Sequence, residues 1–133
     1  MTGLEFIAML AQLATIAKTG KELLFGKSRE AVDAEVQRQV DESTASPELQ
    51  QAVAKISLKV REAYGRRLKK AYDRYVDVIN DPGARPYDWK DARDRAQYDI
   101  CGVLELVKQH NSNSLPSDVK NLWDEFACAN RQP

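Results

Sequence analysis

The side chains that could take part in catalysis or metal binding are few in this sequence. It contains one histidine, His110, and two cysteines, Cys101 and Cys128. A structural zinc site needs four ligands at recognisable spacing. Cys101 and His110 are nine residues apart, which places them on opposite sides of a continuous helix. The sequence therefore predicts neither a metal site nor a cofactor.

Paired carboxylates, which can act as general acid and base, occur in segments with a helical pattern. Asp73 is followed by Asp77, and Asp91 by Asp94. Each pair has Arg or Lys neighbours three or four residues away, as on a solvated helix face whose charges pair locally. Gly-rich phosphate loops and the histidine pair of zinc proteases are absent from the sequence. We therefore expect a protein that is not an enzyme.

The composition is that of a folded, water-soluble domain. Of 133 residues, 43% are hydrophobic and 30% are charged, with 20 Lys and Arg balanced by 20 Asp and Glu. A chain of this length buries a core without disulfides, so we expect one domain over residues 1–133. The zero net charge gives no global field for nucleic acid or anionic lipid. Two cysteines and a start without a basic leader indicate reduced thiols in a cytoplasmic protein.

Five segments carry helical signals, so the predicted fold is all-α, an antiparallel bundle of four to five helices. Gly26 is the expected breaker at the end of the first helix. In order, the predicted helices cover about residues 3–25, about residues 28–42, residues 46–80, a segment capped by Asp88, and a segment capped by Ser117.

The third predicted helix is by far the longest. Ser46 and Pro47 suit its N-cap and its first position, and apolar residues then hold one face as far as Asn80. A helix of about 34 residues is roughly 50 Å long, well beyond its neighbours. Gly65 is the expected point of bending.

Apolar residues dominate the first helix, among them Phe6, Leu10 and Leu13. Its polar positions form a narrow stripe, as in the central helix of a bundle. Two alternatives stay open for these three residues: contact with a partner or a second copy by helix-in-groove docking, and contact with a membrane. The apolar start is similar, over this one helix, to the N-terminal helices of small membrane-perforating domains of cell-death and defence proteins. Its apolar run of about 14 residues is short for crossing a bilayer.

A basic stretch in the third helix, residues 61–74, indicates possible anion or nucleic-acid binding. It carries Arg66, Arg67, Lys69 and Lys70 with tyrosines between them. In such a combination the cations bind phosphates and the aromatic rings stack against bases. An ordinary bundle helix explains more of the stretch, because the tyrosines share the apolar face and the charges form i, i+4 pairs. Nucleic-acid binding is therefore the less favoured interpretation.

The fourth helix has a second face, on which Tyr98, Gly102 and Leu106 lie. A glycine inside a helix costs about 1 kcal/mol relative to alanine, which indicates a close neighbour. That neighbour is either the last helix or a partner surface, and in the second case Trp89 and Trp123 are further candidate contacts. By elimination, the sequence predicts a small non-enzymatic protein that binds another protein or a second copy, as an adaptor, inhibitor, immunity-type or accessory subunit.

Overall fold

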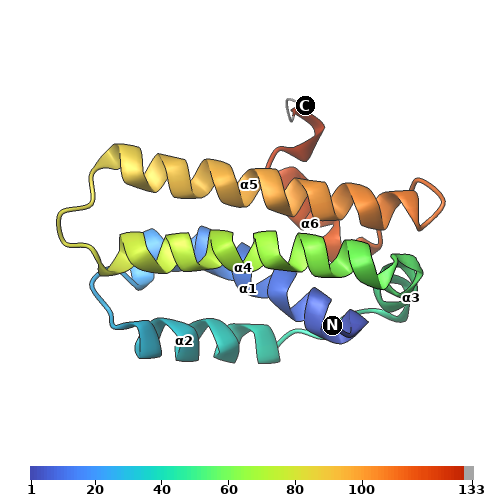
Figure 1. Cartoon of the computed structure of the whole chain (residues 1–133), viewed down its shortest axis with the longest axis horizontal. Coiled ribbons are helices and arrows are strands. Elements are labelled where there is room, and N and C mark those ends of the chain that lie inside the picture. Colours follow the sequence, from blue (N-terminus) through green and yellow to red (C-terminus); the bar gives the residue numbers. More distant parts are fainter. Residues whose placement is uncertain (131–133) are drawn as a thin grey trace.

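The computed structural model describes residues 1–130, and this part of the chain is all-helical, as predicted (Figure 1). It contains six α-helices, more than the four to five expected, because the long third helix is divided in two. In chain order the elements are α1 (Gly3–Leu23), α2 (Arg29–Asp41), α3 (Pro47–Lys55), α4 (Leu58–Asn80), α5 (Pro86–Gln109), α6 (Ser117–Glu125) and a 3-10 turn, η1 (Cys128–Asn130).

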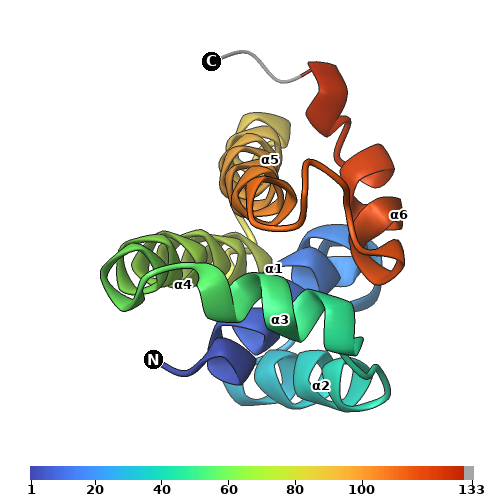
Figure 2. The same ribbon diagram turned by 90° about the vertical axis from the view of Figure 1, so that its right-hand side faces the viewer.

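The three longest helices, α1, α4 and α5, pack against one another and form the centre of the molecule. Figure 2 shows α1 in the middle, with α2 on one side and with α5 and α6 on the other. Phe6 and Leu13 of α1, Leu68 of α4 and Leu104 of α5 are buried in the shared core. No polar or charged side chain within residues 1–130 is buried. The core is therefore apolar throughout, and the shorter helices cover its flanks.

The prediction of one 34-residue helix is wrong, because α3 ends at Lys55 and α4 begins at Leu58. Between them Ile56 is extended, with φ −72° and ψ 131°, and its side chain is buried in the core. Ser57 then caps α4, since its Oγ accepts a hydrogen bond of 3.3 Å from the backbone N–H of Val60. Burial of Ile56 and a serine cap together favour a break that the continuous apolar pattern concealed.

Gly65, the expected point of bending, lies within the unbroken helix α4. It is buried, and a Cβ placed there would clash with Cε of Met1. The absence of a side chain therefore allows Met1 to pack closely against α4. Gly65 serves packing and not bending.

Two predicted helix caps are also wrong. α5 begins at Pro86 with Arg85 as its N-cap, and Asp88 lies inside the first turn, where its carboxylate accepts a 2.9 Å hydrogen bond from the Arg85 backbone. α6 begins at Ser117 itself, with Pro116 in the cap position. In α5 a proline at the first helical position sets the helix start earlier than the polar side chain did, and in α6 the helix already includes the serine.

The two cysteines are not reduced thiols, because Cys101 of α5 and Cys128 of η1 form a disulfide. The chain turns after α6, where Ala127 adopts a φ of 49°, and this turn brings Cys128 back to α5. Disulfides persist mainly in oxidising compartments, so the cysteines no longer support a cytoplasmic location. The pairing depends on how α6 folds back, which local sequence patterns do not report.

Candidate binding groove along α1

One side of α1 is left partly open by its neighbours, and two cavities lie along it. The first, of about 240 Å³, lies between α1, the loop of residues 43–45 and α6. The second, of about 370 Å³, lies between the C-terminal half of α1 and the start of α5. Lys18 lines both cavities. We call the combined surface, from Ile7 to Glu22 with its α5 and α6 walls, the α1 groove.

The half of the groove nearest the start of α1 is mainly apolar. Ile7, Ala11 and Ala14 form its floor, and Val119 and Leu122 of α6 form one wall. The α6 wall is held in place by the carboxylate of Asp118. This carboxylate accepts hydrogen bonds of 2.9 Å from the backbone N–H and 3.1 Å from the hydroxyl of Ser46, the N-cap residue of α3. The apolar half is thus a defined surface between fixed elements.

The other half of the groove is cationic. Lys18 and Lys21 of α1 have no carboxylate within 4.0 Å among residues 1–130. Lys90 lies on the α5 wall, 2.6 Å from Asp94, and this hydrogen-bonded pairing raises the pKa of the lysine. Among residues 1–130, Glu22 is the one carboxylate that lines this half. Its lining therefore carries a net positive charge.

Arg93 is the most constrained cation of this cationic half. Its guanidinium donates to the carbonyl of Ala17 in α1 at 3.3 Å and to the carbonyl of Glu125 at the end of α6 at 3.5 Å. It also lies 4.2 Å from the ring centroid of Phe126. Burial raises the pKa of the neighbouring Tyr75, an effect that the positive charge of Arg93 opposes. Arg93 therefore joins α5 to α1 and to the segment after α6.

Aromatic and apolar side chains border the cationic half where α1 ends. Trp89 lines the α5 wall and is 9% exposed, and its ring centroid lies 6.2 Å from that of Phe25. Phe25 and Leu23 are 55% and 61% exposed. Gly26, with a φ of 78°, allows the turn that holds Phe25 there, and its N–H donates to the carbonyl of Ile79. Exposed apolar side chains beside a groove are a common feature of binding surfaces.

The residues predicted from the sequence as partner contacts do not form one surface. They are Tyr98, Gly102, Leu106, Trp89 and Trp123. Trp89 lies in the α1 groove, but Leu106 is about 25 Å away along α5. Gly102 is buried, and Tyr98 is 49% exposed. Leu106 and Trp123 are half-buried, and α6 packs against α5. Only Trp89 therefore belongs to the candidate site.

The residues predicted for membrane or partner contact, Phe6, Leu10 and Leu13, lie in the core and are at most 3% exposed. Of these three, Leu10 also contributes to the lining of the apolar cavity, and the rest of the α1 lining comes from more outward positions, among them Ala11 and Thr15. Sequence analysis missed these positions. The available signal was the small and polar residues four apart along the helix, but no local pattern shows which side of a helix is left uncovered.

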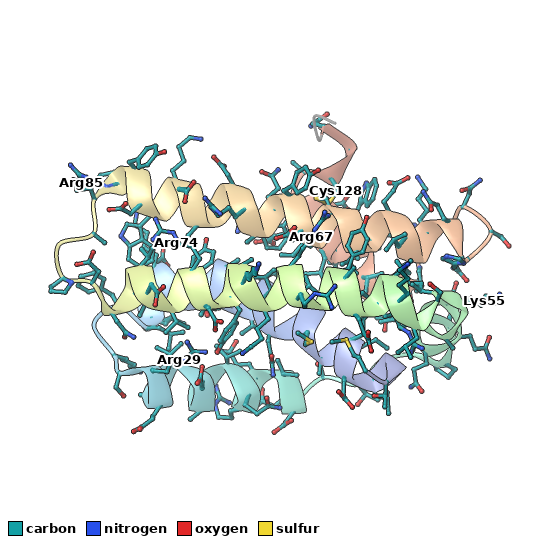
Figure 3. All side chains as sticks on the ribbon, viewed as in Figure 1. Arg29, Lys55, Arg67, Arg74, Arg85 and Cys128 are labelled. Carbon is teal, nitrogen blue, oxygen red and sulfur yellow. A yellow bond between two sulfur atoms is a disulfide. The ribbon has the colours of Figure 1, made fainter. Side chains whose placement is uncertain are left out.

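The basic stretch keeps its four predicted residues at the surface. Arg66, Arg67, Lys69 and Lys70 are exposed, and Lys69 lies 3.9 Å from Asp73. Only Arg67 and Lys70 are brought together, in a shallow depression of about 220 Å³ between α4 and α5 that Arg95 also lines. Figure 3 shows Arg67 on α4 beside α5.

A polar cavity of about 390 Å³ lies between α1, α2 and α4. Its charged groups are already paired, since Arg29 lies 2.7 Å from Asp73 and the hydroxyl of Tyr72 donates to Asp33 at 2.7 Å. Burial, and then the bond to Asp33, raise the pKa of Tyr72. These pairs attach α2 to the core, so we assign the cavity a structural role.

No family model, characterised protein or solved structure matches this chain. None of the helices within residues 1–130 combines the length and the hydrophobicity that a membrane-spanning helix requires. The same part of the chain brings no three His, Cys, Asp or Glu side chains together as a metal site. The α1 groove is therefore the feature on which a functional proposal rests.

Proposed function

We propose that this protein is a non-enzymatic binding protein whose α1 groove holds an acidic, amphipathic helix of a partner protein. The observation that carries the proposal is the joining of an apolar cavity and a cationic cavity at Lys18. A docked helix needs an apolar floor for the side chains that anchor it. Complementary charge beside that floor selects the partner and speeds its association.

The dimensions of the groove suit a short helix. Ile7 and Glu22 are 15 residues apart on α1, which is about 22 Å along the helix axis. A partner helix of about 15 residues has the same length. The small side chains of Ala11 and Ala14 on the floor allow its backbone to come close.

The charges support an acidic partner. Because Lys18 and Lys21 have no carboxylate partner among the described residues, a bound Asp or Glu forms ion pairs without breaking existing ones. A nucleic-acid strand would leave the apolar half of the groove unused. A flat bilayer would not enter a concave surface. A protein helix uses both halves.

Peptide binding tests this proposal directly. The probe is a synthetic 15-residue helix with leucines on one face and glutamates on the other, and the readout is the fluorescence of Trp89 in a Trp123→Phe background. We expect saturable binding that weakens as salt rises. A scrambled peptide of the same composition and a peptide with lysines in place of the glutamates should not bind.

Matched variants locate the site. Lys18→Glu combined with Lys21→Glu should weaken binding about tenfold or more, whereas Lys59→Glu, at an exposed lysine of α4, should have no effect. Ala11→Glu should block the apolar half, with Ala34→Glu on the exposed side of α2 as its control. Circular dichroism checks that each variant keeps its helices.

Three results would overturn the proposal. The first is equal binding of the scrambled peptide. The second is peptide affinity that the groove variants leave unchanged. The third is concentration-dependent self-association that Ala11→Glu abolishes, because the occupant of the groove is then a second copy of this chain.

A further inference from the structure

Residues four apart on α5 hold the segment that follows α6. Arg93 donates to the carbonyl of Glu125, and Nε2 of Gln97 donates to the carbonyl of Phe126 at 2.6 Å. Cys101, one further turn along, carries the disulfide to the last described turn of the chain. Arg93, Gln97 and Cys101 form a stripe along one side of α5, so the hydrogen bonds and the covalent bond act on the same short segment.

Arg93 belongs both to this stripe and to the α1 groove. It lines the cationic half, while the ring of Phe126 and the carbonyl of Glu125 support its guanidinium from the other side. Its guanidinium also donates a hydrogen bond to the carbonyl of Ala17 of α1. The position of one groove cation therefore depends on a segment that the disulfide ties to α5.

We propose that the Cys101–Cys128 disulfide regulates the α1 groove. In the oxidised protein the bond keeps Phe126 beneath Arg93, so the cationic half is preorganised for the acidic helix. Reduction removes the covalent tie on the segment, so its position is less constrained and the affinity for that helix falls. This inference rests on the proposed function of the groove.

The reaction is a thiol–disulfide exchange with a dithiol reductant. A thiolate of the reductant attacks Sγ of Cys128, which forms a mixed disulfide, and Cys101 leaves as a thiolate that takes up a proton. The second sulfur of the reductant, as a thiolate, then attacks the reductant's first sulfur in the mixed disulfide. Cys128 leaves as a thiolate, which takes up a proton. Two electrons and two protons pass to the protein, and the reductant becomes a cyclic disulfide.

The sulfur of Cys128 becomes accessible to a reductant when η1 opens. It is 5% exposed and begins η1, between the exposed residues Ala127 and Ala129. Opening this three-residue turn presents its sulfur without unfolding an α-helix. After reduction, the interactions of Gln97 and Arg93 and the buried ring of Phe126 hold the segment alone. A less constrained Arg93 loses more freedom when a ligand binds, which lowers affinity.

The first test compares binding of the same acidic peptide to oxidised and dithiothreitol-reduced protein, with reduction verified by thiol titration. We expect reduction to weaken binding about fivefold. Cys101→Ser combined with Cys128→Ser should bind like the reduced protein and should not respond to dithiothreitol. In Arg93→Met, binding should be weak and equal in the two redox states, because the coupling passes through that side chain.

A second variant covers the case in which reduction or the serine variant unfolds the protein. Phe126→Leu keeps the disulfide but removes the ring beneath Arg93, so the oxidised variant should bind about as weakly as the reduced wild type. Wild-type affinity in Phe126→Leu overturns the inference. Equal affinities of folded oxidised and reduced wild-type protein do the same.

A measurement without peptide separates this inference from the proposed function. Iodide is attracted to the cationic half, whereas acrylamide is neutral. The ratio of iodide to acrylamide quenching of Trp89 therefore reports the positive potential of that half, and we expect the ratio to fall on reduction. If the peptide fails to bind the oxidised protein while this ratio still falls, the proposed function is wrong and the redox coupling stands. An unchanged ratio after verified reduction rejects the coupling.

Discussion

The hydroxyl of Tyr72 in α4 donates a hydrogen bond of 2.7 Å to the carboxylate of Asp33 in α2. Arg29 extends this connection, because its guanidinium lies 3.3 Å from Asp33 and 2.7 Å from Asp73 of α4. Only two residues of α2, both valines, are buried. An α-helix with so small an apolar face depends on polar contacts for its position.

Tyr72→Phe removes the hydrogen bond and leaves the ring in place. We expect the free energy of unfolding to fall by about 1 kcal/mol, since Asp33 keeps Arg29 as a partner. Urea unfolding followed by circular dichroism measures the change. Tyr87→Phe, at a tyrosine that is 72% exposed, is the matched control. Equal stabilities of the two variants would contradict a role for this bond.

The stability of the protein should fall at alkaline pH. Burial, followed by the hydrogen bond to Asp33, raises the pKa of Tyr72 above its usual value. A phenol whose pKa is higher in the folded state stabilises that state below the unfolded pKa of about 10, and this contribution is lost as the pH rises further. Urea unfolding at a series of pH values should show the loss. Tyr72→Phe should show a shallower loss, with part remaining because the pKa of Tyr75 is raised too.

Ser57→Ala tests the break between α3 and α4. Loss of the N-cap should lower the free energy of unfolding by about 1 kcal/mol. Helical content by circular dichroism should not rise, because burial of Ile56 keeps the two helices apart. Ser43→Ala is the control, since the Ser43 hydroxyl donates to a carbonyl at the end of α2 and caps no N-terminus. A rise in helicity in Ser57→Ala would mean that the serine alone prevents one continuous helix.

Gly65→Ala tests whether this glycine is a hinge. The new Cβ would clash only with the end of the flexible Met1 side chain and would make an ordinary contact with Sδ of Met9, and alanine is favoured over glycine in a helix by about 1 kcal/mol. We expect the free energy of unfolding to stay the same or to rise by up to about 1 kcal/mol. Gly20→Ala is the comparison, because its Cβ would lie 3.0 Å from Cδ1 of the buried Ile79. Thermal unfolding of both variants measures the difference, and Gly20→Ala should be less stable than Gly65→Ala.

Reduction of the disulfide should lower the free energy of unfolding by about 3.5 kcal/mol, as loop-closure entropy gives for cysteines 27 residues apart. Urea unfolding with and without dithiothreitol measures the difference. The variant with serine at both Cys101 and Cys128 should not respond to the reductant. A difference near zero would show that the closed loop is held equally well without the bond.

The sequence by itself determined the all-helical class and most helix positions. Helical periodicity and capping are local, because side chains three or four residues apart share a face and a cap lies within one turn of the N–H that it binds. The cap at Ser46 is an example: its Oγ accepts a hydrogen bond of 3.1 Å from the backbone of Leu49, and the sequence predicted the helix start there.

Only the tertiary structure decided the break at Ile56, the Cys101–Cys128 bond and the α1 groove. Each depends on contacts between residues far apart in the chain. Ile56 turns inward because neighbouring helices bury it, and Cys128 reaches α5 because α6 folds back. Lys18 and Lys90 meet in one cavity although 72 residues separate them. Local patterns show which face of a helix is apolar, but packing decides which face the other helices leave open.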